Sequence, residues 1–129
     1  MFTAKGAFSS FSVNDLEKAK KFYTETLGLK INEQPGMGFD LDVPGGTRVF
    51  VYPKGDQHEP ANFTVLNFDV ADIDKTVDEL NALGVTTERY EGMPQDDKGI
   101  MRGIAQHRGP DIAWFKDPSG NVLSVLQKG

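Results

Sequence analysis

Apolar side chains recur at helical spacing in two segments of this chain. The first segment has them at Leu16, Ala19, Phe22, Tyr23 and Leu27, and the second has them at Ile73, Val77, Leu80 and Leu83. Side chains three and four positions apart share one face of a helix, so each segment is predicted to bury one helical face. Asn14 is the expected N-cap of the first helix, with Glu17 completing a capping box. Gly28 and Gly84 are expected to end the two helices in the left-handed conformation.

Short apolar runs separated by turn residues flank both helices and predict strands. One strand precedes each helix, over about 8–13 and 65–70. After the helices, the predicted strands are 29–33, 39–43, 48–53, 85–88, 100–104, 112–116 and 122–127. Between the last two strands, residues 117–121 contain the Pro and Gly of a tight hairpin turn.

The pattern occurs twice along the chain. Residues 12–18 (SVNDLEK) align with residues 69–75 (DVADIDK) at an offset of 57, and a polar linker, 54–62, separates the two copies. The sequence therefore predicts an α+β fold of two tandem βαβββ modules, 1–56 and 61–129, within a single domain, 1–129. Neither half-sheet can bury both of its faces alone, so we expect them to pack on each other or on a second chain.

Composition narrows the function classes. The 129 residues carry a formal net charge of −5 and include no cysteine, which excludes disulfide scaffolds, thiolate nucleophiles and cysteine-based metal sites. Residues 57–129 hold seven basic against twelve acidic side chains, so we expect neither nucleic acid nor an anionic membrane as partner. No secretory signal or membrane-spanning run is visible, and a cytoplasmic location is expected.

Two stretches resemble a known family. Residues 11–23 (FSVNDLEKAKKFY), followed by Leu27-Gly28-Leu29, and residues 114–121 (WFKDPSGN) resemble the vicinal oxygen chelate superfamily. This superfamily includes glyoxalase I, bleomycin-resistance proteins and extradiol dioxygenases. The resemblance implies two βαβββ modules whose mixed sheet curls into a cup, with the helices outside. We further expect a homodimer.

The same resemblance implies where a metal would be bound in metal-dependent members. The four ligand positions of the family fall on Phe8, Val49, Val65 and Ser124. Three of these side chains have no donor atom and a lone serine hydroxyl is a poor ligand, so we expect no metal and no cofactor. Glyoxalase-type isomerisation and ring-cleaving dioxygenation are correspondingly disfavoured.

Strand alternation predicts what lines the cup instead. An apolar and aromatic floor is expected from Phe8, Val49, Val65 and Trp114. Polar groups are expected from Ser10, Asn67 and Ser124, and pairing across the 117–121 hairpin should place Trp114 beside Ser124. His107 is expected near the rim, while His58 is expected to be an ordinary surface residue. Such a mixture is typical of a pocket for a small organic molecule.

The favoured reading is a metal-free protein that binds a small organic molecule, like the drug-binding resistance proteins. Arg48, Arg102 or Arg108 would meet an anionic group if the ligand has one. One alternative is a metal-dependent lyase, isomerase or dioxygenase with a shifted ligand set that recruits His107 and Asp69. Another is a partner-binding module with a filled cup.

Overall fold

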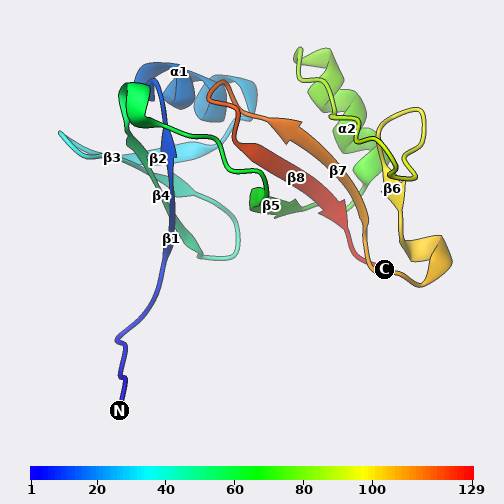
Figure 1. Ribbon diagram of the computed structural model, residues 1–129, viewed down its shortest axis with the longest axis horizontal. Coiled ribbons are helices and arrows are strands. Elements are labelled where there is room, and N and C mark those ends of the chain that lie inside the picture. Colours follow the sequence, from blue (N-terminus) through cyan, green and yellow to red (C-terminus); the bar gives the residue numbers. More distant parts are fainter. The chain divides into compact units, whose positions relative to one another are not determined.

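The computed structural model describes residues 1–129, which divide into two compact units, Met1–Pro60 and Ala61–Gly129. In the first unit (Figure 1), the elements are β1 (Ser9–Val13), α1 (Leu16–Lys21), η1 (Phe22–Thr26), β2 (Lys30–Gln34), β3 (Gly38–Asp42), β4 (Arg48–Pro53) and η2 (Gly55–Gln57). Here η1 is a turn of π-helix that continues α1, and η2 is a short 3-10 helix. The sheet has the order β1-β4-β3-β2. β1 and β4 are parallel, and the other pairs are antiparallel.

The second unit repeats this order. Its elements are β5 (Thr64–Asp69), α2 (Ile73–Ala82), β6 (Met101–Arg102), η3 (Ile104–Gln106), β7 (Asp111–Lys116) and β8 (Val122–Gln127). The sheet has the order β5-β8-β7-β6, with β5 and β8 parallel and the other pairs antiparallel. The predicted α+β class with two βαβββ modules is confirmed.

The predicted strand at 85–88 is wrong. Val85 and Thr87 are buried in an alternating pattern, which imitates a strand. However, the Glu88 carbonyl accepts a hydrogen bond from the Gln95 side chain, and the Thr87 hydroxyl donates to the Lys98 carbonyl. The Glu88 amide does donate one backbone hydrogen bond to the Trp114 carbonyl on β7, but no strand forms over 85–88, and the only strand between α2 and β7 is the short β6.

Both helices begin at an aspartate. The carboxylate of Asp15 accepts a hydrogen bond from the Lys18 amide, and that of Asp72 accepts one from the Lys75 amide. The N-cap of the first helix is therefore Asp15, one residue later than predicted. The predicted N-cap at Asn14 and its capping box with Glu17 are wrong. Glu17 instead forms an exposed ion pair with Lys20 at 3.3 Å. Gly28 and Gly84 have φ of 72° and 86°, which confirms the predicted helix ends.

The first unit buries one face of its sheet under α1 and η1. Tyr23 is fully buried there, with its ring centroid 6.2 Å from that of Phe11 and 6.4 Å from that of Phe39. The other buried side chains on this face are Val13, Leu41, Val49 and Val51. The opposite face, called here the helix-free face of the first sheet, carries Ser10, Ser12, Asp40, Phe50 and Tyr52.

The second unit is built in the same way, with α2 packed on β7 and β8 (Figure 1). Ile73, Val77 and Leu80 of the predicted apolar stripe are buried. Leu83 is 55% exposed, contrary to prediction, because α2 ends at Ala82 and Leu83 is its C-cap. The helix-free face of the second sheet carries Asn67, Trp114 and Ser124, which form one cross-strand row.

None of the helices combines the length and the apolar character needed to cross a bilayer.

Candidate functional site

Trp114, Ser124 and Asn67 are neighbours on the helix-free face of the second sheet. Trp114 lies opposite Ser124 in the β7–β8 pair, and Asn67 lies opposite Ser124 in the β5–β8 pair. The Ser124 hydroxyl is buried and donates a hydrogen bond to Oδ1 of Asn67. The predicted pairing of Trp114 with Ser124 across the hairpin is confirmed, so an indole ring and an amide flank one buried hydroxyl.

Two residues that sequence reasoning missed complete this cluster. Nε1 of Trp114 donates a hydrogen bond to the Thr64 hydroxyl at 3.1 Å. The Tyr90 ring meets the Trp114 ring edge-on, with centroids 5.5 Å apart and an interplanar angle of 76°. Aromatic pairs prefer this edge-on geometry. We call Thr64, Asn67, Tyr90, Trp114 and Ser124 the tryptophan cluster.

The loop before β6 holds Tyr90 in place. Oε1 of Gln95 accepts from the Tyr90 amide at 2.8 Å, and Nε2 of Gln95 donates to the carbonyls of Glu88 and Gly99 at 2.9 and 2.8 Å. Burial, followed by the negative charge of Glu88, raises the pKa of Tyr90 above its usual value of 10.0. The phenol is therefore a neutral hydrogen-bond donor at physiological pH. No periodicity in this loop signals the contact.

Val65 does not take its predicted place in a regular strand. Thr64 pairs with Val122 and Leu66 with Leu123, so the register shifts across Val65, which has no partner on β8. A bulge of this kind places two residues opposite one and breaks strict alternation. For this reason Thr64, and not Val65 as strict alternation would predict, contacts Trp114.

In the first unit, the prediction that Val49 lies on the cup floor is wrong. Val49 is 1% exposed and pairs with Ser9 and Leu41 on the face that α1 and η1 cover. Its neighbour Phe50 pairs with Ser10 and occupies the helix-free face instead. Phe8, just before β1, is 55% exposed.

The two histidines differ in their surroundings, and only His58 departs from its prediction. His58 was expected to be an ordinary surface residue, yet it is half-buried and its Nδ1 is hydrogen bonded to the Ser12 hydroxyl at 2.8 Å. His107 is exposed at the end of η3, with a left-handed φ of 54°. No hydrogen bond or ion pair connects the His107 ring to the tryptophan cluster. A catalytic imidazole would need such an orienting group.

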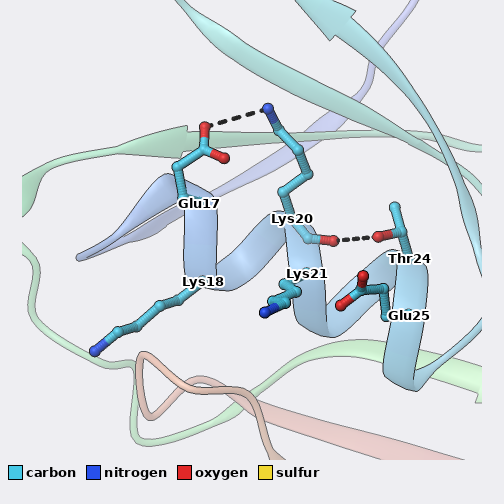
Figure 2. Close-up of a pocket in the computed structure, with 6 residues that line it drawn as sticks. All are labelled: Glu17, Lys18, Lys20, Lys21, Thr24 and Glu25. Carbon is cyan, nitrogen blue, oxygen red and sulfur yellow. Dashed lines mark hydrogen bonds and ion pairs between the residues drawn. The ribbon is translucent and has the colours of Figure 1, made fainter.

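A hollow of about 420 Å³ lies on the outer side of α1 and η1 (Figure 2). It is lined by Glu17, Lys18, Lys20, Lys21, Thr24 and Glu25. Its side chains are charged or polar, and the ion pair between Lys20 and Glu17 spans part of it. The hydrogen bond that the Lys20 ammonium donates to Glu33 raises the pKa of Lys20, although burial opposes this. None of the predicted site residues contributes to this hollow.

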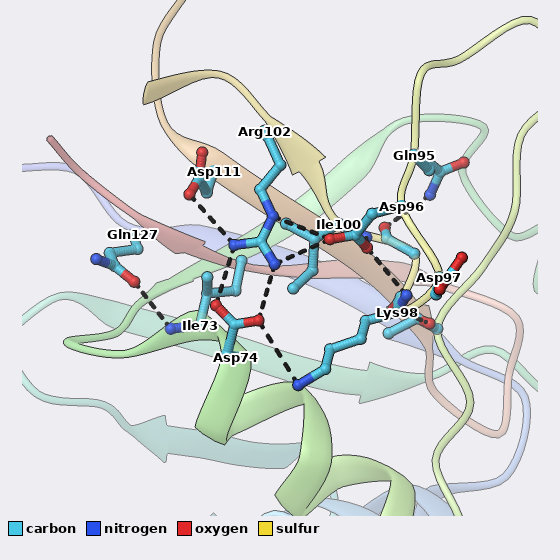
Figure 3. A network of polar contacts seen from close by, with 12 residues as sticks. Ile73, Asp74, Gln95, Asp96, Asp97, Lys98, Ile100, Arg102, Asp111 and Gln127 are labelled. Carbon is cyan, nitrogen blue, oxygen red and sulfur yellow. Dashed lines mark hydrogen bonds and ion pairs between the residues drawn. The ribbon is translucent and has the colours of Figure 1, made fainter. Parts of the chain in front are cut away.

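Of the three arginines considered for an anionic ligand group, Arg102 is fully engaged (Figure 3). Its guanidinium donates to both carboxylate oxygens of Asp74, at 2.8 and 3.0 Å, and through Nε to Asp96 at 2.9 Å. Asp111 lies 3.6 Å from its Nη1. Arg102 therefore connects α2, the loop before β6, and β7. Its ion pairs stabilise the fold.

The residues at the family's ligand positions do not fit a divalent cation. Phe8, Val65 and either Val49 or Phe50 have no ligand atom, and the Ser124 hydroxyl is hydrogen bonded to Asn67. Nowhere in the chain do three His, Asp or Glu side chains converge in a metal-binding group. The side chains present instead suit an organic molecule with apolar surface and a few polar groups.

Comparisons with known proteins agree with this fold. A sequence model of the Glyoxalase/Bleomycin resistance protein/Dioxygenase superfamily matches residues 8–125. The uncharacterized protein YraH of Bacillus subtilis strain 168 is 31% identical, with 89% of this chain and 91% of that protein aligned. A probable lactoylglutathione lyase of Vibrio cholerae is 27% identical over 89% of this chain and 84% of that protein. The structure of TnmS3, an antibiotic binding protein from Streptomyces sp. CB03234, has a TM-score of 0.66 and 24% identity, covering 99% of this chain and 100% of that one.

Proposed function

The chain belongs to the Glyoxalase/Bleomycin resistance protein/Dioxygenase superfamily, and we propose that within it the chain is a metal-free protein that binds a small organic molecule. The ligand contacts the tryptophan cluster, where Trp114 and Tyr90 supply aromatic surface and Asn67 and Thr64 supply hydrogen bonds. We further propose that the protein acts as a homodimer.

The observation that carries this proposal is the tryptophan cluster itself. An edge-on aromatic pair adjoins a threonine hydroxyl, an amide and a buried serine hydroxyl. A few polar groups set in an aromatic surface are typical of sites that orient an organic ligand. The family's ligand positions hold no histidine, glutamate or glutamine, which supports binding without metal.

The likeness to TnmS3, an antibiotic binding protein, is one of fold and supports the proposal to that extent. The probable lactoylglutathione lyase among the relatives favours a different function, metal-dependent lyase chemistry. The two functions differ in whether the purified protein takes up a divalent ion.

Native mass spectrometry separates these functions. The protein is purified without chelator and exposed in turn to zinc, nickel, manganese and ferrous iron. We expect a dimer without stoichiometric metal, and an organic mass retained on it would identify the ligand. One tightly bound ion per subunit would contradict metal-free binding and favour the lyase. A monomeric mass at micromolar concentration would contradict the homodimer.

Trp114 is the only tryptophan in the chain, so its emission reports on the site alone. A library of planar aromatic compounds is titrated while this emission is followed. A compound that binds the tryptophan cluster should change the emission saturably, and Tyr90→Leu should weaken its binding by about three- to tenfold through loss of one aromatic contact. Leu83→Ala, at the exposed end of α2, is the control and should leave the affinity unchanged. Equal affinity in Tyr90→Leu would mean that the ligand does not use this cluster.

A further inference from the structure

Arg48, at the start of β4, lies among aromatic rings on the helix-free face of the first sheet. Its Cζ is 4.0 Å from the centroid of the Phe8 ring and 5.9 Å from that of Phe50. The Phe50 ring in turn stacks on Tyr52, with centroids 5.9 Å apart and an interplanar angle of 15°. Both distances to Arg48 lie within the range of cation–π attraction. The guanidinium thus lies over the Phe8 ring and near the stacked pair of Phe50 and Tyr52.

A carboxylate fixes the guanidinium from one side only. Nε of Arg48 donates to Oδ1 of Asp40 at 3.0 Å. The other oxygen of Asp40 accepts from the Gln34 side chain at 3.1 Å, which holds the carboxylate in place. A guanidinium has five N–H donors, and this arrangement uses one of them. Arg48 is also 48% exposed, so the terminal Nη groups are accessible from solvent.

Other arginines of the chain differ in this respect. The guanidinium of Arg102 forms ion pairs with Asp74, Asp96 and Asp111. Both terminal nitrogens of Arg89 donate to the carbonyls of Asp96 and Asp97. Arg48 alone among these three combines a fixed orientation with unused terminal donors. A guanidinium that is already oriented loses less conformational entropy when it binds an anion.

We propose that Arg48, Phe8 and Phe50 form a binding site for a planar aromatic carboxylate. The carboxylate accepts two hydrogen bonds from the Nη groups of Arg48, and its ring lies against Phe50 and Tyr52. Asp42 pairs with Arg48 in the strand register and lies on the same face. Asp40 and Asp42 offset the positive charge of Arg48, so charge alone does not select a carboxylate ligand. Selection of the ligand depends on the two hydrogen bonds from the Nη groups. The proposal rests on contacts within the first unit and does not require a ligand at the tryptophan cluster.

Naphthoate and its neutral analogue naphthamide test this site. Each is titrated into the full-length protein and followed by proton–nitrogen correlation NMR. We expect naphthoate to shift the Nε–Hε signal of Arg48 and the amides of Ser10 and Phe50 saturably. Arg48→Met should weaken naphthoate binding about tenfold or more, because two charge-assisted hydrogen bonds are lost. Naphthamide should bind weakly and equally to both proteins.

Two further variants make the result decisive. Arg48→Lys keeps the charge without the planar fork and should lose most of the affinity for naphthoate. Lys54→Met removes one positive charge from the same unit at the other end of β4 and should leave binding unchanged. The proposal is overturned if Arg48→Met and wild type bind naphthoate equally, or if Lys54→Met weakens binding as much as Arg48→Met. It is also overturned if naphthoate at millimolar concentration leaves the signals of Arg48, Ser10 and Phe50 unmoved. Binding seen only at Trp114 would support the proposed function and refute this site.

Discussion

Replacing Arg102 with methionine should destabilise the second unit, because Arg102 joins three parts of it. The guanidinium binds Asp74 in the first turn of α2, Asp96 in the loop before β6, and Asp111 at the start of β7 (Figure 3). Methionine keeps most of the apolar stem and removes the charge. The variant therefore isolates the polar contacts from the packing of the side chain.

The size of the effect follows from the exposure of the partners. Arg102 is 37% exposed, Asp74 is 47% exposed and Asp111 is 12% exposed. Exposed ion pairs contribute at most about 1 kcal/mol each, because water screens them. The bidentate geometry and the nearly buried Asp111 raise the total, so we expect a loss of about 2 kcal/mol in the free energy of unfolding.

Urea unfolding followed by circular dichroism measures this loss. Lys75→Met is the control, since it removes a cation from a single exposed pair with Glu79 at 3.9 Å and should cost less than about 0.5 kcal/mol. If Arg102→Met also costs less than about 0.5 kcal/mol, the network contributes nothing to stability and the reasoning is refuted.

The pH dependence gives a second check. The hydrogen bond from Arg102 lowers the pKa of Asp74 below its usual 3.8. Burial would raise the pKa of Asp96, but hydrogen bonds from the Ile100 amide, Arg102 and the Lys98 amide together outweigh it and lower the pKa. Arg102 stays protonated throughout, since its own pKa is raised. A carboxyl with a lowered folded-state pKa stabilises the protein above its unfolded pKa and loses that effect as pH falls. The difference between wild type and Arg102→Met should therefore be constant above about pH 5 and shrink as pH falls below 3.8 through the lower folded-state values.

Two other substitutions test the frame around the candidate sites. Gly38→Ala should unfold the first unit or cost about 3 kcal/mol or more, because φ at Gly38 is 151° and a Cβ there would lie 2.1 Å from the Val51 carbonyl oxygen. Gly6→Ala is the control, since no atom lies within 4 Å of the added Cβ, and it should leave the urea midpoint unchanged. A stable Gly38→Ala variant would contradict the prediction and show that β3 and β4 can separate at this position. Asp117→Ala should cost about 2–4 kcal/mol, because the buried carboxylate accepts from the amides of Ser119 and Asn121 and from the Asn121 side chain. Thermal unfolding measures it, and a shift of less than about 2 °C would mean that the hairpin keeps its geometry without this carboxylate.

The correct part of the site prediction depended on local pairing. Trp114 and Ser124 belong to strands joined by a tight turn, and the residues of such a turn set the register of the hairpin. The covered face of α2 followed in the same way from helical spacing. Both inferences need only residues that are close in the sequence.

The errors in the site prediction, at Val49 and Val65, arose where distant segments pair. β1 and β4 are parallel and no tight turn connects them, so their register is set by packing against Tyr23 and the rest of the core. That register puts Val49 on the covered face and Phe50 on the other. The bulge at Val65 is likewise invisible in a pattern of alternating residues.

The sequence by itself determined the two βαβββ repeats, the buried faces of their helices and the Trp114–Ser124 pair, because periodicity and turn chemistry act over a few residues. Only the tertiary structure decided which side chains join them. Tyr90 reaches Trp114 through a loop that Gln95 holds by hydrogen bonds, and Arg48 differs from Arg102 only in the neighbours that the folded chain brings to each. Contacts between residues far apart in the sequence depend on the packing of the whole unit, and no local pattern encodes them.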